Sequence, residues 1–266
     1  MEIRINGKAA YYNTGGVEWR KGQPTLCLIH GASLDHSVWV LLTRYFARHG
    51  YNVIAPDLPG HGHSEGEAVA SIDAYASWIN QLMSACDCEE VRLAGHSMGS
   101  LVALAAAGQQ PQRISHLVLL GTAFPMPVGA ALLDAAKDNH HAAIDMVTGY
   151  GHSFRSHLGG NPVAGINIYQ SAVALMEAAG SGVLHADMLA CDQYSDGFEA
   201  ASRLLQAGDC RCELILGEHD QMTRPAGARE LAAALQARVT VLKDCGHMLM
   251  SEQPEETLQA LLRAMD

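Results

Sequence analysis

The chain has 266 residues, of which 48% are hydrophobic and 17% charged, and its net charge at pH 7 is −11. This composition indicates a compact folded protein rather than a disordered or fibrous one, and the acidic balance argues against nucleic acid or an acidic membrane surface as a partner. No apolar run approaches the ~20 residues that cross a bilayer. The seven cysteines are expected to be reduced thiols, and because residues 1–7 lack the pattern of a secretory signal, we expect a cytoplasmic protein.

Strands and helices alternate along the first 123 residues. Alternating isoleucines before Asn6-Gly7 predict a hairpin with residues 10–13. Continuous apolar runs typical of strands buried on both faces follow, at 25–30, 52–57, 91–94 and 116–120. Helical spacing of apolar residues separates them, at 37–49 and 71–85. This alternation predicts a mostly parallel sheet with helices on both faces.

The alternation stops between about 124 and 195. Alanine-rich helical patterns replace it, at 131–141, 143–146 and 168–178. Two more strands, at 212–217 and 239–242, and two more helices, at 226–236 and 254–265, complete the chain. We therefore predict a core domain made of residues 1–123 and 196–266, and a helical lid at 124–195 over the carboxyl ends of the strands, where open α/β sheets bind ligands.

The motif Gly95-His-Ser-Met-Gly99 joins the strand at 91–94 to the helix-forming run at 101–107. Its glycines permit a reversal so sharp that a Cβ at either position would collide with the chain, which leaves Ser97 on strained backbone with an exposed hydroxyl. The pattern alone also fits a helix that begins with a capping serine. The setting between a strand and a helix favours a nucleophile.

A serine nucleophile needs a histidine to take its proton and a carboxylate to hold that histidine. Asp220 comes after the strand at 212–217, and His247 comes after the strand at 239–242. Because carboxyl ends of parallel strands meet at one edge of a sheet, we expect both side chains near the serine. Glu218, in the same loop as Asp220, is the competing carboxylate.

The oxyanion formed when serine attacks a carbonyl needs two hydrogen-bond donors. The amide of Met98, at the positive end of a helix, is one candidate, and the amide of Ala32, in the loop after the first buried strand, is the other. The chemistry would then be complete without a metal or a cofactor.

Five motifs in this order resemble the α/β-hydrolase superfamily over nearly the whole chain: His30-Gly31-Ala32, Asp57-Leu-Pro-Gly-His-Gly-His-Ser64, Gly95-His-Ser-Met-Gly99, Leu216-Gly-Glu-His-Asp220 and Gly246-His247. The resemblance implies the α/β-hydrolase fold, a mostly parallel eight-stranded sheet flanked by helices, with an inserted helical lid. It also implies roles for the candidate residues: Ser97 as nucleophile, His247 as general base and acid, Asp220 as its partner, and Ala32 and Met98 as the oxyanion hole.

The serine at position 97 limits which reactions of the family are expected, because members that open epoxides or remove halogens attack with an aspartate at this position. Acyl transfer remains, and carboxylesterases, lactonases, thioesterases and C–C bond hydrolases of the family share this motif set. The sequence around Ser97 and the small helical lid are most similar to a carboxylesterase, which would act on small, largely apolar esters through an acyl-enzyme. A C–C bond hydrolase of ring-cleavage products and a lactonase are the alternatives. A ligand-binding protein that kept the fold is the alternative outside enzymes. The protein is expected to be a monomer or a homodimer.

Other chemistry-bearing residues have simpler explanations. Asp57, His61 and His63 have a spacing that metals sometimes use, but loops of this kind are usually held by internal hydrogen bonds, and we expect no metal there or at the Cys-x-Cys pairs. His96 is expected to pack or hydrogen-bond beside the serine. In the lid, histidines are expected on exposed faces with one or two near the substrate, and apolar residues mainly in internal packing: His140, His141, His152, His157, Met126, Met146, Leu158 and Met176.

Overall fold

The computed structural model describes residues 1–138, 141–160 and 162–266. Its strands run in one sheet in the spatial order β1-β2-β4-β3-β5-β6-β7-β8. Their bounds are β1 Glu2–Ile5, β2 Lys8–Asn13, β3 Thr25–Ile29, β4 Asn52–Pro56, β5 Val91–His96, β6 Ile114–Leu120, β7 Arg211–Gly217 and β8 Arg238–Leu242. The pairs β1/β2 and β2/β4 are antiparallel and all other pairs are parallel. The predicted eight-stranded, mostly parallel sheet is therefore confirmed.

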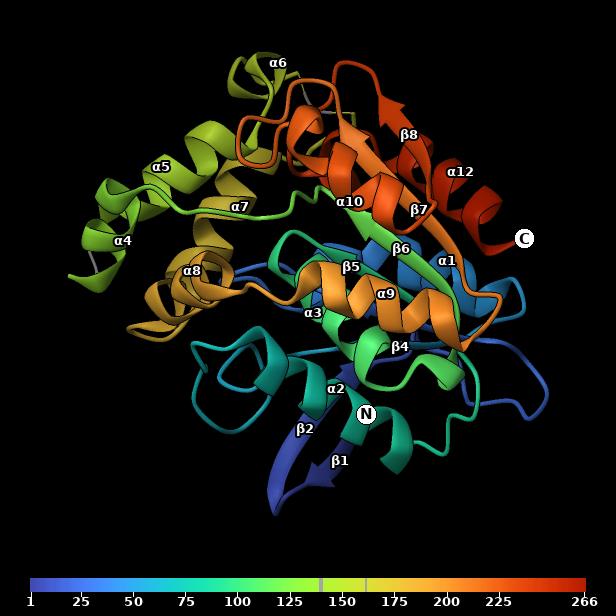
Figure 1. Cartoon of the computed structure of the whole chain (residues 1–266). Coiled ribbons are helices and arrows are strands. Elements are labelled where there is room, and N and C mark those ends of the chain that lie inside the picture. The colour runs from blue at the N-terminus through green and yellow to red at the C-terminus, as the bar shows by residue number, and fades with distance from the viewer. Residues whose placement is uncertain (139–140, 161) are drawn as a thin grey trace.

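Helices connect these strands and cover both faces of the sheet (Figure 1). Their bounds are α1 Val40–Arg48, α2 Ile72–Ala85, α3 Met98–Gln109, α4 Ala130–Lys137, α5 His141–Gly151, α6 Phe154–His157, α7 Ile168–Ala178, α8 Val183–Gln193, α9 Gly197–Ala207, α10 Arg229–Ala234, α11 Leu249–Glu252 and α12 Pro254–Met265. Short 3-10 turns precede α1 and α10 and link α3 to β6.

The alternation of side chains along each strand divides the core between the two faces. On β3, Cys27 and Ile29 pack with the helices α2, α3 and α9, whereas Leu26 and Leu28 pack with α1 and α12. All four side chains are fully buried. This burial on both faces explains why the strand reads as a continuous apolar run instead of an alternating one.

The segment between β6 and β7 holds the helices α4 to α9. The described residues from 124 to 194 contain no strand, as expected. Three of these helices, α6, α8 and α9, were not anticipated from the sequence. Helix α9 packs on α3, where a Cβ on Gly108 would lie 2.7 Å from the Cα of Ala200, whereas α4, α5, α7 and α8 gather at one end of the sheet (Figure 1).

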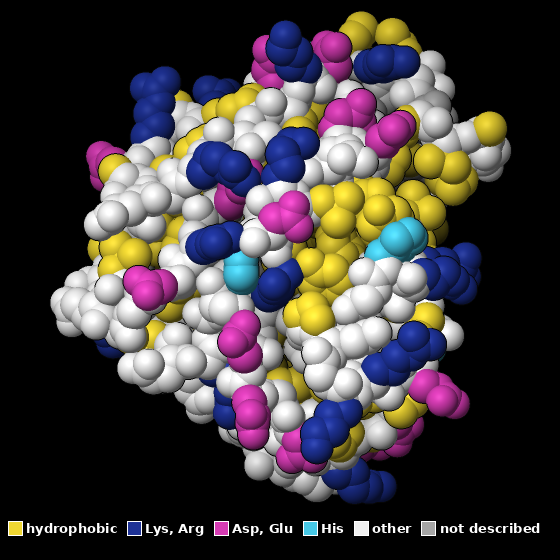
Figure 2. Space-filling view, turned by 90° about the vertical axis from the view of Figure 1, so that its right-hand side faces the viewer, with side chains coloured by type: hydrophobic (Ala, Val, Ile, Leu, Met, Phe, Trp, Pro, Cys, Tyr) yellow, Lys and Arg dark blue, Asp and Glu magenta, His cyan; other side chains and the backbone are white. Residues whose placement is uncertain are grey.

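Charged side chains of both signs are interspersed over the face drawn in Figure 2, and hydrophobic side chains gather near its middle. Among the described residues, no helix has the length and apolar character that crossing a bilayer requires. The seven cysteines form no disulfide, in agreement with the expected free thiols.

Candidate active site

The turn predicted around Ser97 is present between β5 and α3. Ser97 has a φ of 54° and a ψ of −121°, a conformation that costs a residue other than glycine about 1–3 kcal/mol. A Cβ on Gly95 would lie 2.0 Å from the carbonyl oxygen of Gly99, and a Cβ on Gly99 would lie 2.3 Å from that of His30. Both glycines are therefore required for the close approach of β5, α3 and the loop after β3.

The side chain of Ser97 does not act as a helix cap. Ser97 precedes α3, yet its hydroxyl makes no capping hydrogen bond. Its carbonyl oxygen instead accepts from the backbone N–H of Ser100 at 2.8 Å. The half-buried Ser97 lines two cavities, so its hydroxyl is available to a bound molecule.

The structure brings Asp220 and His247 together. Nδ1 of His247 lies 2.7 Å from Oδ2 of Asp220. The other carboxylate oxygen, Oδ1, accepts from the backbone N–H groups of Met222 and Thr223, each at 2.8 Å. The Thr223 hydroxyl donates to Oδ2 at 2.7 Å. With Nδ1 turned to a carboxylate, Nε2 of His247 is the nitrogen left to take and return a proton.

These contacts keep the Asp220 carboxyl ionised. Burial by itself would raise its pKa, but the charge and hydrogen bond of His247 and the donors of Thr223 outweigh burial, and the pKa of Asp220 lies below its ordinary value. A buried anion at this place stabilises the imidazolium that forms when His247 takes a proton.

The competing carboxylate, Glu218, lies elsewhere. Its side chain is exposed and accepts from the backbone N–H of Asp244 at 3.2 Å. Its nearest histidine is His219, with the two side-chain atoms 3.9 Å apart. The geometry therefore assigns the carboxylate beside His247 to Asp220.

The loop after β3 is fixed by a buried histidine. His30 donates from Nδ1 to the carbonyl oxygen of Gly31 at 2.8 Å, and its Nε2 accepts from the backbone N–H of Leu58 at 3.0 Å. Burial lowers the pKa of His30 to about 4, so the ring is neutral and holds one tautomer. Ala32 follows in this loop and borders both cavities together with Ser97.

Met98 and His96 flank the serine in the chain. Met98 is buried at the first position of α3, directly after Ser97. Ala32, on the loop after β3, borders the same cavities as Ser97. Nε2 of His96 donates to the carbonyl oxygen of His247 at 2.8 Å, and burial lowers the pKa of His96 to about 3. His96 is thus a neutral packing and hydrogen-bonding residue, as expected.

A buried carboxylate on α8 joins the helices between β6 and β7 to this site. Oδ2 of Asp187 accepts from the backbone N–H of Ser33 and from Nε2 of His61, both at 2.8 Å, and Oδ1 accepts from the Tyr75 hydroxyl at 2.9 Å. Ser33 directly follows Ala32. Asp187 has no motif around it and lies on a helix that was not anticipated, so no signal in the sequence indicated it.

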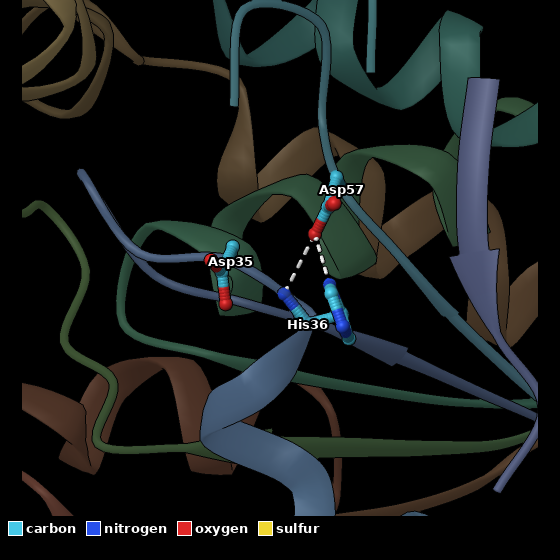
Figure 3. A group of neighbouring side chains, drawn as sticks. All are labelled: Asp35, His36 and Asp57. Carbon is cyan, nitrogen blue, oxygen red and sulfur yellow. Dashed lines mark hydrogen bonds and ion pairs between the residues drawn. The ribbon is translucent and has the colours of Figure 1, made fainter. Parts of the chain in front are cut away.

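The acidic cluster around Asp57 is held by internal hydrogen bonds. Oδ1 of Asp57 accepts from the backbone N–H of His36 at 2.8 Å and from its Nδ1 at 2.7 Å (Figure 3), and Oδ2 accepts from the N–H of His63 at 2.8 Å. Asp57, His36 and the neighbouring Asp35 could each offer one ligand atom to a metal ion. The carboxylate of Asp57, however, already accepts hydrogen bonds from two loops and holds them together. Because His61 bonds Asp187, it does not join Asp57 in a metal site.

The histidines and apolar residues singled out between β6 and β7 differ in whether they are exposed, buried or next to a cavity. His141 and His157 are exposed, as expected, His152 is buried, and His140 lies outside the described residues. Of the apolar residues, Leu158 is 72% exposed, whereas three methionines border cavities at Ser97 rather than only packing internally: Met126, Met146 and Met176.

Two cavities meet at Ser97. One is a narrow space of about 20 Å³, less open than the other and here called the enclosed cavity, which His247 borders together with residues of α5 and α7. The other is a mainly apolar groove of about 420 Å³, lined by the segment 126–132, by Met146 and Tyr150 of α5 and by the loop after Asp220. Among the residues that the structure describes, no charged side chain lines the groove.

Comparisons with known proteins identify the family of the chain. The profile of the alpha/beta hydrolase family matches residues 28–260. The pimeloyl-[acyl-carrier protein] methyl ester esterase of Aromatoleum aromaticum is 31% identical over 248 residues, which is 88% of this chain and 95% of that protein. The (E)-2-((N-methylformamido)methylene)succinate hydrolase of Acinetobacter baylyi is 32% identical over 151 residues, and this match spans only 55% of that relative and 56% of this chain.

The fold has close counterparts among solved structures. The crystal structure of the enol-lactonase from Burkholderia xenovorans superposes with a TM-score of 0.86, covering 100% of this chain and 99% of that one. Its sequence identity is 22%, so this likeness concerns the arrangement of the chain and not the substrate.

Proposed function

The chain belongs to the alpha/beta hydrolase family, and from this premise we propose that it is a serine hydrolase that cleaves carboxylic esters with apolar acyl groups. The observation that carries the proposal is the buried contact of 2.7 Å between His247 Nδ1 and Asp220 Oδ2 beside the strained turn at Ser97. The Aromatoleum relative is itself an esterase, which supports ester cleavage as the reaction.

In the first half-reaction, Ser97 attacks the ester carbonyl while His247 takes its proton through Nε2. Asp220 orients the ring and offsets the positive charge that develops on it. The amides of Ala32 and Met98 donate to the oxyanion, and the positive end of α3 adds to this stabilisation. Collapse of the tetrahedral intermediate breaks the bond to the alcohol oxygen, which receives the proton from His247.

In the second half-reaction, water attacks the acyl group on Ser97 and gives one proton to His247. The bond to the serine oxygen then breaks, and that oxygen takes the proton back. Every group needed for both steps belongs to the chain itself. The uncharged lining of the groove fits an apolar acyl group better than a product that carries additional carboxylates, because a buried charge needs a partner.

The test is release of acid from simple alkyl esters, followed by titration at constant pH, for the native protein and for Ser97→Ala. Loss of Ser97 should lower turnover by ~10⁴-fold or more while the protein stays folded. A folded native protein that releases no acid from any ester would refute the proposal and favour the ligand-binding alternative. A Ser97→Ala variant that keeps the native rate would refute Ser97 as the nucleophile.

A further inference from the structure

The two cavities at Ser97 differ in their access to His247. The enclosed cavity and the groove share Ala32, Ser97 and two methionines, but among the described residues His247 borders the enclosed cavity alone. An ester bound at Ser97 extends in two directions from its carbonyl carbon, one toward the acyl chain and one toward the alcohol. The two spaces give these two parts unequal room.

Proton transfer decides which part lies where. On collapse of the tetrahedral intermediate, the alcohol oxygen leaves with the proton held by His247, so it must lie within hydrogen-bond reach of that ring. The acyl chain has no such requirement. On the basis of the proposed function, we propose that the enclosed cavity receives the leaving alcohol and limits it to about the size of methanol, while the groove receives the acyl chain.

The sizes of the two spaces support this orientation. A volume of about 20 Å³ accommodates roughly one water-sized group, and its walls include the buried side chains of Val147 and Met176 on α5 and α7. The groove has about 420 Å³ and offers the apolar side chains of Met126, Leu132 and Met146 to a chain of methylenes. The substrate class is therefore the methyl or similarly small esters of longer apolar acids.

The orientation is tested with two series of esters assayed by acid release. For hexanoate esters, kcat/KM should fall by about tenfold or more from methyl to butyl, because methylenes that do not fit a closed pocket are rejected strongly. For methyl esters, kcat/KM should rise with acyl length from acetate, by roughly fourfold for each methylene buried in the groove. Equal rates for methyl and butyl hexanoate would overturn the orientation while leaving ester hydrolysis itself intact, whereas no acid from any ester would refute the proposed function.

Two matched variants locate each preference. Val147→Ala, in the enclosed cavity, should raise the butyl-to-methyl ratio of kcat/KM by about tenfold. Leu132→Trp, in the groove, should lower the ratio for methyl decanoate over methyl butyrate by a similar factor. The reverse pairing, in which Val147→Ala alters the acyl profile and Leu132→Trp alters the alcohol profile, would contradict the assignment.

Discussion

The buried carboxylate of Asp187 provides a sharp test of how the helices between β6 and β7 are held. It accepts hydrogen bonds from Ser33, His61 and Tyr75, and both it and His61 are buried from solvent. Asp187→Asn keeps the shape of the side chain, removes its charge and turns one acceptor into a donor. Losing a hydrogen bond to a charged group costs about 1.5–3 kcal/mol, so the variant should be less stable than the native protein by at least this amount at neutral pH.

The pH dependence of this loss has a defined sign. Burial by itself would lower the pKa of His61, but the charge and hydrogen bond of Asp187 outweigh burial and raise the pKa above 6.5. The stability that this pair contributes is therefore fully present below pH 6.5 and is lost as the pH rises through the folded pKa. Without the carboxylate, burial dominates and lowers the pKa of His61, so the variant instead loses stability as the pH falls below 6.5.

The difference in unfolding free energy between native protein and Asp187→Asn should thus grow as the pH falls from about 8.5 to 5.5, by up to ~1.4 kcal/mol per pH unit. Urea unfolding followed by circular dichroism measures it. Histidines outside the pair are common to both proteins and cancel in the difference. Asp192→Asn, an exposed change on the same helix at a carboxylate that accepts from the backbone N–H of Val128, is the matched control for the pH dependence. A difference that stays flat or shrinks toward low pH would refute the reasoning.

Three further predictions concern the active site. Gly95→Ala should lower the unfolding free energy by ~3 kcal/mol or more, since its Cβ would lie 2.0 Å from a backbone oxygen; Gly129→Ala, with open space around it, should be near neutral in the same urea titration. Thr223→Val removes a donor to Asp220 and should lower kcat about tenfold in the acid-release assay, and an unchanged kcat would contradict its role. Asp220→Asn should lower kcat by ~10⁴-fold, whereas Glu218→Gln should leave it within about twofold; a larger loss in Glu218→Gln than in Asp220→Asn would reverse the choice of carboxylate.

The strands and the turn at Ser97 could be predicted because their requirements are local. A strand buried on both faces must be apolar at every position, as at 25–29, and the turn needs glycine where a Cβ would meet backbone. The contact between Asp220 and His247 could be predicted because both follow parallel strands that end at one edge. These constraints are visible in a single sequence.

The parts that could not be predicted depend on tertiary contacts. Apolar and polar residues are poorly separated around helix α8, since its buried face includes the polar Asp187. The role of this carboxylate can be recognised only when the distant donors His61 and Tyr75 are in place. Likewise, the exposed Leu158 and the cavity-lining Met176 belong to the same residue class in the sequence. The division of space around Ser97 follows from how α5 and α7 pack, which no local pattern encodes.

The central claim is that Ser97 carries the acyl group, and covalent labelling tests it most directly. The protein is treated with an alkyl fluorophosphonate, which transfers its phosphonyl group to an activated serine, and the modified peptide is identified by mass spectrometry. We predict stoichiometric modification of Ser97, no modification in Ser97→Ala, and strongly slowed modification in Asp220→Asn. Modification of a different residue, or ester hydrolysis that persists at the native rate after Ser97 is fully labelled, would contradict the account.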